Sequence, residues 1–155
     1  MKVLIIGGVA GGATAAARLR RLDENTQIII IEKSGYISYA NCGLPYYIGG
    51  AIKDKRQLTL QTPQSFFKRF RIDARVNNEA LKIDEFKKTV LIKNLVTGEE
   101  YEETYDKLIL APGAKPIKPT IEGIDNPKVF TLRTVEDTFE IADFIFPVNS
   151  LSKYK

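Results

Sequence analysis

The stretch K-V-L-I-I-G-G-V-A-G-G-A-T-A-A-A, residues 2–17, decides how this chain begins to fold. The apolar run from Lys2 to Ile6 predicts a buried parallel strand, and the alanine-rich segment from Gly11 to Leu22 predicts a helix that packs closely on a sheet. A glycine-rich turn lies between them, where the amides and dipole of the helix N-terminus favour an anion. The run from Gln27 to Ile31 predicts a second buried strand. The chain therefore opens with a strand–helix–strand unit.

The spacing of the glycines and of one acidic residue predicts a dinucleotide site. Against the pattern G-x-G-x-x-G, Gly7 and Gly12 fit, while Val9 occupies the middle position. Glu32 follows the second strand, about 25 residues further on, as expected for the carboxylate that accepts hydrogen bonds from an adenosine ribose. The alternative is a glycine turn in an unrelated α/β protein with a surface glutamate. The combination favours nucleotide binding.

Cys42 is the only cysteine, in the run S-Y-A-N-C-G-L-P-Y-Y. The pattern predicts a short helix from about Cys42 to Ile48, with Asn41 or Ser38 as its cap and Gly49-Gly50 at its end. A helix N-terminus favours the thiolate form of a cysteine. A lone cysteine cannot form an intramolecular disulfide, so a redox cycle would use a mixed disulfide, a persulfide or a sulfenic acid. The alternative is an inert buried cysteine.

The rest of the chain changes from helical to strand patterns and back. A helix is predicted from Pro63 to Phe70 and another from Thr134 to Phe146, which Pro147 stops. The tail from Val148 to Lys155 carries no strong structural signal. Short strands, the first three in an antiparallel meander, are predicted at Glu79 to Ile83, Thr89 to Lys93, Glu100 to Tyr105 and Lys107 to Ala111.

Composition excludes several classes of function. With 155 residues, a net charge of +4 and no histidine, the chain has room for one domain and cannot build a histidine triad or a histidine metal site, and we expect no metal. Its basic residues are scattered and lack a nucleic-acid recognition motif, so a phosphate-bearing small molecule is the more economical partner. No apolar run is long enough for a membrane span or signal peptide. A single unpaired cysteine fits a reducing compartment, and we expect the cytoplasm.

Three segments together resemble a known family: Gly7 to Ala13, Glu32-Lys33, and Ser38 to Gly50. They are similar to the N-terminal part of single-cysteine pyridine nucleotide–disulfide oxidoreductases, most of all to the coenzyme A–disulfide reductase group, which includes NAD(P)H-dependent persulfide reductases. The segment from Tyr105 to Gly113 resembles the strand and turn that close the family's first FAD segment.

The resemblance implies a Rossmann-like, FAD-binding α/β fold with a parallel sheet and a small antiparallel β-meander, incomplete relative to the family. Residues 1–113 would be the first segment of the FAD-binding domain, 114–133 a connector, and 134–155 a helix and tail at the start of a missing NAD(P)H-binding domain. Family chains are several times longer and form homodimers. We therefore expect an N-terminal portion, either a truncated gene product or an expressed part.

The resemblance also assigns roles to individual residues. Cys42 would stand near the flavin, with Glu32 at the adenosine ribose and Lys33 beside it. Backbone around Ala80 would touch the adenine side, and Ala111, Pro112 and Gly113 the flank of FAD. The FAD pyrophosphate would be lined by Gly7, Gly8, Ala10, Gly11 and Gly12. Coenzyme A would be bound by Thr14, Arg18, Arg21, Ser38 and Asn41.

Two of these assignments have alternatives. An arginine suits phosphate because its guanidinium forms a bidentate fork, but Arg18 and Arg21 could equally be solvated helix charges. Peroxidases and water-forming oxidases of the family place a histidine where Ala10 stands, so NADH oxidase or peroxidase chemistry is the weaker interpretation.

We therefore expect an FAD-dependent enzyme that reduces coenzyme A disulfide or a coenzyme A persulfide with NAD(P)H through Cys42. The alternatives are a non-catalytic flavin- or nucleotide-binding module, and an inactive remnant that folds without cofactor.

Overall fold

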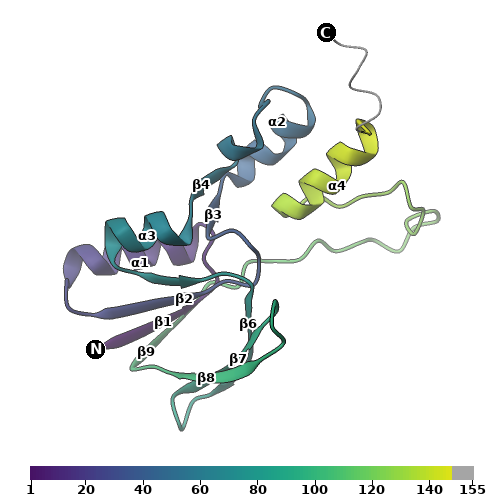
Figure 1. Ribbon diagram of the computed structural model, residues 1–155. Coiled ribbons are helices and arrows are strands. Elements are labelled where there is room, and N and C mark those ends of the chain that lie inside the picture. Colours follow the sequence, from purple (N-terminus) through teal and green to yellow (C-terminus); the bar gives the residue numbers. More distant parts are fainter. Residues whose placement is uncertain (148–155) are drawn as a thin grey trace. The chain divides into compact units, whose positions relative to one another are not determined.

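The computed structural model describes residues 1–147 (Figure 1). The tail from Val148 to Lys155, where the sequence carries no structural signal, lies outside the described residues. Within the described part, the chain divides into two compact units. The first unit comprises Met1–Tyr39 and Gln61–Gly113, and the second comprises Ala40–Leu60 with 114–147.

A four-stranded parallel sheet forms the centre of the first unit. Its strands are β1 (Lys2–Ile6), β2 (Gln27–Ile31), β5 (Asp73–Arg75) and β9 (Lys107–Leu110), in the spatial order β5-β2-β1-β9. The chain moves outward from β1 to β2 and β5 on one side, and β9 then adds on the other side of β1. The direction of winding thus reverses between β1 and β9. In open parallel sheets, ligands bind outside the carboxyl ends of the strands at such a reversal.

Helices cover one face of this sheet. In Figure 1, α1 (Gly11–Leu22) and α3 (Pro63–Phe70) lie along the same side of the strands. The core on this side consists of buried side chains from the strands, both helices and the loops beside them: Val3, Ile5, Ala16, Ile28, Ile30, Ile37, Phe66 and Ile72. Both faces of the strands are buried, which explains why β1 and β2 read as continuous apolar runs.

An antiparallel meander covers the other face. It consists of β6 (Asn78–Asp84), β7 (Thr89–Asn94) and β8 (Glu100–Thr104). Val90 and Ile92 alternate with less buried residues along β7 and pack against Leu4, Ile29 and Ile31 of the parallel sheet. The predicted fold class, a Rossmann-like α/β domain with a small meander, is therefore confirmed.

A charged cluster joins the meander to the parallel sheet. Glu103 on β8 forms ion pairs with Lys2 of β1 and with Arg75 of β5, the latter at 2.7 Å between Nη1 and Oε2. Burial by itself raises the pKa of Glu103, but the hydrogen bonds and positive charges of Lys2 and Arg75 outweigh it, so the pKa lies below its ordinary value. The cluster thus favours an ionised Glu103 in the folded chain.

The second unit is built around short helical segments. These are the 3₁₀ turn η1 (Asn41–Gly43), α2 (Leu44–Ile48), the 3₁₀ turn η2 (Lys55–Gln57) and α4 (Val135–Ile145). The rings of Tyr47 on α2 and Phe139 on α4 meet edge to face at 5.7 Å between their centres. Thr134 and Asp137 form a capping box at the start of α4, which confirms the helix start predicted there. The sequence did not predict two short strands near the boundaries of the two units, β3 (Ser38–Tyr39) and β4 (Thr59–Gln61).

The predicted cap of the helix after Cys42 is wrong. The segment begins as a 3₁₀ turn and becomes α-helical only at Leu44, and neither Ser38 nor Asn41 caps either segment through its side chain. The amides at this end bond to backbone instead: Gly43 N–H donates to the Ala40 carbonyl at 2.8 Å. Since the backbone already satisfies these donors, no capping side chain is required.

Candidate nucleotide-binding site and the Cys42 segment

Three strands of the parallel sheet end side by side at one edge. Gly7 directly follows β1, and its amide donates to the Ile31 carbonyl of β2 at 2.8 Å. Ala111 directly follows β9, and its amide donates to the Ile6 carbonyl of β1 at 2.7 Å. Glu32 follows β2. The carboxyl edge of the sheet therefore brings the glycine turn, Glu32 and Ala111 together.

Close backbone packing dictates two glycines of the turn. A Cβ atom on Gly7 would lie 1.9 Å from the Ala111 carbonyl oxygen, and Gly7 also has a φ of +92°. A Cβ atom on Gly12 would lie 1.8 Å from the Gly7 carbonyl oxygen. Both contacts are with backbone, which cannot swing aside as a side chain can. These two positions are the ones that matched the dinucleotide-binding pattern.

The opposite side of the turn is open. Gly11 and Ala10 are exposed, and a Cβ atom on Gly11 would meet only the Ala111 Cβ at 3.7 Å. Ala10 occupies the N-cap of α1 with a φ of 56°, a strained conformation for alanine, and it provides no capping side chain. The first turn of α1 holds no acidic residue. No acidic side chain of the helix itself therefore neutralises the positive end of its dipole, which suits a phosphate group.

Glu32 is largely buried, with 9% of its surface exposed, and it ties the turn to the loop after β2. Its Oε2 accepts a hydrogen bond from the Gly8 amide at 2.7 Å. Its Oε1 accepts from both the amide and the hydroxyl of Ser34, each at 2.8 Å. The sequence predicted Glu32 as a site residue, but not these bonds or any role for Ser34.

The residues predicted beside Glu32 lie directly after β2 and on β6. The Lys33 ammonium pairs with the Glu79 carboxylate of β6 at 2.7 Å. The Asn78 amide donates to the Glu32 carbonyl at 3.0 Å, which holds the start of β6 next to the end of β2. Ala80 follows two residues later on β6 and packs against the core between the meander and the parallel sheet. Beyond Ala111, both Pro112 and Gly113 are exposed.

The candidate coenzyme A residues of α1 share one exposed face. Thr14, Arg18 and Arg21 are spaced four and three residues apart, so they lie one above the other on the helix. Neither arginine forms an ion pair within residues 1–147. Arg20 differs, because its guanidinium bonds to backbone carbonyls, including that of Phe70 at 2.8 Å. Arg20 is therefore structural, while Arg18 and Arg21 are free to bind an anion.

Cys42 belongs to the second unit, as does Asn41, whereas Ser38 belongs to the first. Cys42 is exposed at the middle of η1, so it is not the buried cysteine of the alternative interpretation. The Asn41 Oδ1 atom is buried and finds no hydrogen-bond partner within the described part of the chain. A Cβ atom on Gly43 would lie 3.3 Å from side-chain carbons of Ala40, Ile52 and Leu58.

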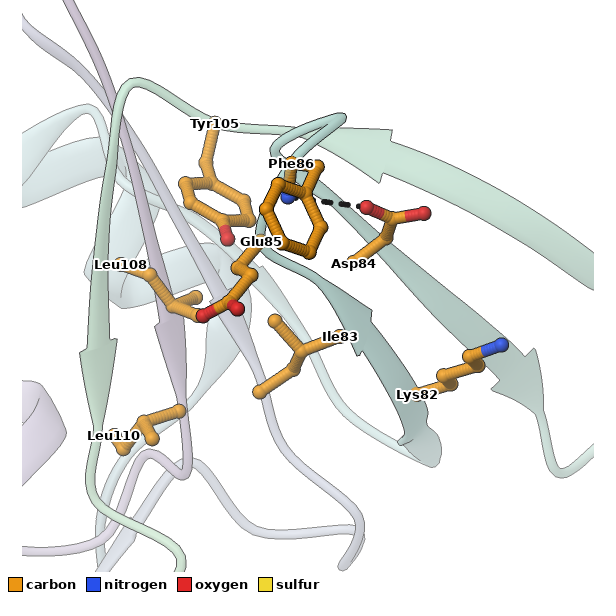
Figure 2. A pocket seen from close by; sticks show the side chains of 8 residues that line it. All are labelled: Lys82, Ile83, Asp84, Glu85, Phe86, Tyr105, Leu108 and Leu110. Carbon is orange, nitrogen blue, oxygen red and sulfur yellow. Dashed lines mark hydrogen bonds between the residues drawn. The ribbon is translucent and has the colours of Figure 1, made fainter.

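A separate hollow of about 680 Å³ lies in the first unit between the β6–β7 hairpin and β9. Figure 2 shows Leu108 and Leu110 of β9 on one side and Ile83 of β6 on the other, with Phe86 near Tyr105. None of the residues that the sequence predicted for a site lines it. Its lining nevertheless includes Leu110, the last residue of β9, which directly precedes Ala111 at the carboxyl edge of the sheet.

Two further properties concern the described residues only. No helix within 1–147 has both the length and the apolar character needed to cross a membrane. In the same range, no group of histidine, cysteine or acidic side chains is arranged to hold a metal ion.

Comparison with known proteins agrees with this architecture. Residues 1–147 match the family described as pyridine nucleotide-disulphide oxidoreductase. The chain is 44% identical over 144 residues to a coenzyme A disulfide reductase of Staphylococcus aureus, a match that covers 93% of this chain and 32% of that protein. The chain thus spans about a third of the length of the curated relatives it matches.

Solved structures give the same result. The reduced CoADR-RHD of Bacillus anthracis shares 53% sequence identity and a TM-score of 0.91, over 96% of this chain and 27% of that one. An NAD-dependent persulfide reductase from A. fulgidus shares 40% identity and a TM-score of 0.87, over 94% and 27%. A water-forming NADH oxidase from Lactobacillus brevis shares 27% identity and a TM-score of 0.84, over 93% and 32%. The resemblance seen in the sequence is confirmed: this chain belongs to the pyridine nucleotide-disulphide oxidoreductase family.

Proposed function

We propose that this chain binds the adenosine diphosphate half of FAD and carries the redox-active thiol of an enzyme that reduces coenzyme A disulfide or a coenzyme A persulfide with NAD(P)H. The observation that carries this proposal is that sequence identity is higher to the reductase structures than to the oxidase structure. Identity is 53% and 40% to the two disulfide or persulfide reductase structures, but 27% to the water-forming oxidase. Residues 1–113 would be the first segment of the FAD-binding domain, 114–133 a connector, and 134–155 the start of a further domain.

The residues at the carboxyl edge of the sheet fit FAD. Gly7 and Gly12 hold the turn tightly against backbone, while Gly11 and Ala10 leave its outer side open above the end of α1. The pyrophosphate would lie there, against the amides of the helix, together with Gly8. Glu32 would accept a hydrogen bond from the adenosine ribose, with Lys33 and the backbone around Ala80 on the adenine side, and Ala111, Pro112 and Gly113 on the flank. When bound, FAD would relay an electron pair from NAD(P)H.

Cys42 would carry the exchange with substrate. Its thiolate attacks one sulfur of coenzyme A disulfide; the sulfur–sulfur bond breaks, one coenzyme A thiolate leaves, and a mixed disulfide forms. Two electrons from NAD(P)H then reduce this mixed disulfide, returning the Cys42 thiolate and a second coenzyme A thiol. The exposure of Cys42 supports this role, because a disulfide as large as that of coenzyme A needs open access to the sulfur. We expect the enzyme to work as a homodimer in the cytoplasm, which is a reducing compartment.

The coenzyme A phosphates would pair with Arg18 and Arg21 on α1, beside Thr14. Both guanidinium groups are without a protein carboxylate within 1–147, so no existing ion pair has to break when phosphate binds. Ser38 and Asn41 would provide polar contacts.

Oxidase or peroxidase chemistry within the same family is the second candidate. It would use the sulfenic acid of Cys42. Ala10 and the absence of histidine from the sequence argue against it, because no imidazole is available to assist oxygen or peroxide.

Mass spectrometry of the intact protein tests the proposal. After incubation with coenzyme A disulfide, the chain should gain the mass of one coenzyme A, and Cys42→Ser should gain none. A chain that gains no coenzyme A in this incubation, but forms a stable sulfenic acid when incubated with hydrogen peroxide, would favour the oxidase or peroxidase. A chain that takes up neither FAD nor coenzyme A would contradict both and indicate an inactive remnant.

A further inference from the structure

The carboxylate of Glu32 is held at both of its oxygens. Oε2 accepts the Gly8 amide at 2.7 Å, and Oε1 accepts two donors from Ser34 at 2.8 Å each. A carboxylate has room for about four donors, two on each oxygen. Ser34 therefore fills Oε1, and the remaining acceptor position lies on Oε2, next to the amide of the glycine turn.

The hydroxyl of Ser34 has one hydrogen and two acceptors within reach. The Glu32 Oε1 atom is 2.8 Å away and the Tyr36 carbonyl oxygen is 3.2 Å away, so the shorter and charge-assisted bond goes to Glu32. The Tyr36 amide in turn donates to the Ser34 hydroxyl oxygen at 3.3 Å. The hydroxyl thus forms a relay between the backbone after β2 and the carboxylate. Such a chain of bonds strengthens the one that ends on the charge.

We infer that Ser34 is a positioning residue of the nucleotide site: it fixes the Glu32 carboxylate so that Oε2 is presented to a ribose hydroxyl. This inference rests on the proposed contact between Glu32 and the adenosine ribose. Without the Ser34 hydroxyl, Oε1 keeps only the Ser34 amide, and the carboxylate gains freedom to rotate about its last bond. The net free energy of ribose binding is then smaller, because binding must also order the carboxylate.

Calorimetric binding of two nucleotides tests the inference. The probes are ADP and 2′,3′-dideoxyadenosine diphosphate, which differ only in the ribose hydroxyls that Glu32 would contact. Wild type should bind ADP more tightly than the dideoxy analogue. In Ser34→Ala the affinity for ADP should fall about three- to tenfold, the range of one ordinary hydrogen bond, because Glu32 keeps its contact with the ribose but is held less firmly, while the affinity for the analogue stays unchanged. Ser34→Thr, which keeps a hydroxyl, should restore the preference.

Ser65→Ala is the matched control. Ser65 lies in the same unit, and its hydroxyl accepts the Thr62 amide in the capping box of α3 at 2.9 Å. Its loss should lower the thermal stability and leave the ratio of the two nucleotide affinities as in wild type.

Two results would overturn the inference in distinguishable ways. If wild type prefers ADP and Ser34→Ala keeps the full preference, or loses affinity for both nucleotides equally, Ser34 has a structural role only and the proposed function stands. If wild type binds both nucleotides equally, the contact between Glu32 and the ribose is wrong, and the positioning role is wrong with it.

Discussion

The glycine turn and the Cys42 turn both lead into a helix and both contain a buried glycine, yet they are built differently. In the glycine turn, added atoms on Gly7 or Gly12 would meet backbone within 2 Å. In the Cys42 turn, an added atom on Gly43 would meet only side-chain carbons, at 3.3 Å. The first turn is fixed by main-chain packing in a sheet, and the second by side chains around a short helix. We therefore call the glycine turn rigid, because an added side chain would meet backbone. We call the Cys42 turn adaptable, because an added side chain would meet only side chains that can move.

We expect the greatest loss of stability when one methyl group is added to the glycine turn. Gly12→Ala places a Cβ atom 1.8 Å from the Gly7 carbonyl oxygen, so β1 and α1 must move apart. We expect the free energy of unfolding to fall by about 3 kcal/mol or more, measured by urea denaturation. Gly11→Ala, one residue away, is the control and should change it by less than about 1 kcal/mol. Equal losses in both variants would contradict the packing argument.

The second prediction concerns the charged cluster in the same unit as the glycine turn. Lys2 and Arg75 lower the pKa of Glu103 below its ordinary value of 4.5, so the folded chain holds this proton less tightly than the unfolded chain. The resulting stability is present above the unfolded pKa and is lost as the pH falls through the folded pKa. Glu103→Gln should therefore cost about 1–3 kcal/mol at pH 7, and less at pH 3.

The measurement is the difference in unfolding free energy between wild type and Glu103→Gln at the two pH values. A difference that does not shrink on acidification would mean that Glu103 acts through packing and not through its charge.

The third prediction repeats the first substitution in the adaptable turn. Gly43 has a φ of −80°, which alanine adopts freely, and its neighbours are side chains that can give way. Gly43→Ala should change the unfolding free energy by less than about 1 kcal/mol, because slight crowding is offset by a less flexible unfolded chain. Differential scanning calorimetry of Gly43→Ala and Gly12→Ala under the same conditions compares the two losses of stability directly. A loss as large as that of Gly12→Ala would remove the distinction between the two turns.

Several helices and strands could be predicted from the sequence, because local requirements of the backbone produce recognisable sequence patterns. The apolar runs gave β1 and β2 with the observed bounds, and Pro63 to Phe70 is the helix that was predicted. The spacing of Thr134 and Asp137 also indicated the capping box of α4. These features depend on neighbours in the sequence, which are visible in one chain.

The shortest strands and some side-chain roles could not be predicted from the sequence, because they depend on tertiary contacts. The strands β3, β4 and β5 have two or three residues, too few for any periodicity. Ser34 gave no signal, because its role arises only once the loop after β2 folds back on Glu32. Asn41 looked like a cap, but the backbone of η1 satisfies the amides that a cap would bind.

A substitution at Asn41 should change the stability of the fold least. Its Oδ1 atom is buried without a partner among the described residues, so the fold gains little from this side chain. Asn41→Ala should leave the unfolding free energy within about 0.5 kcal/mol of wild type, or raise it, because an unsatisfied buried acceptor is removed. Formation of the coenzyme A adduct at Cys42 should become slower. A marked loss of stability would show that Asn41 serves the fold and not the substrate.

In the proposed function, the carboxyl edge of the parallel sheet binds an adenosine diphosphate through Glu32. Calorimetric titration of ADP and FAD into wild type and Glu32→Gln tests it most directly, with thermal unfolding as the check that both are folded. We expect both ligands to bind wild type and to bind the variant more weakly by ~1.5–3 kcal/mol, as for a lost hydrogen bond to a charged group. Equal affinities in two folded proteins, or no binding of ADP to wild type, would contradict the claim.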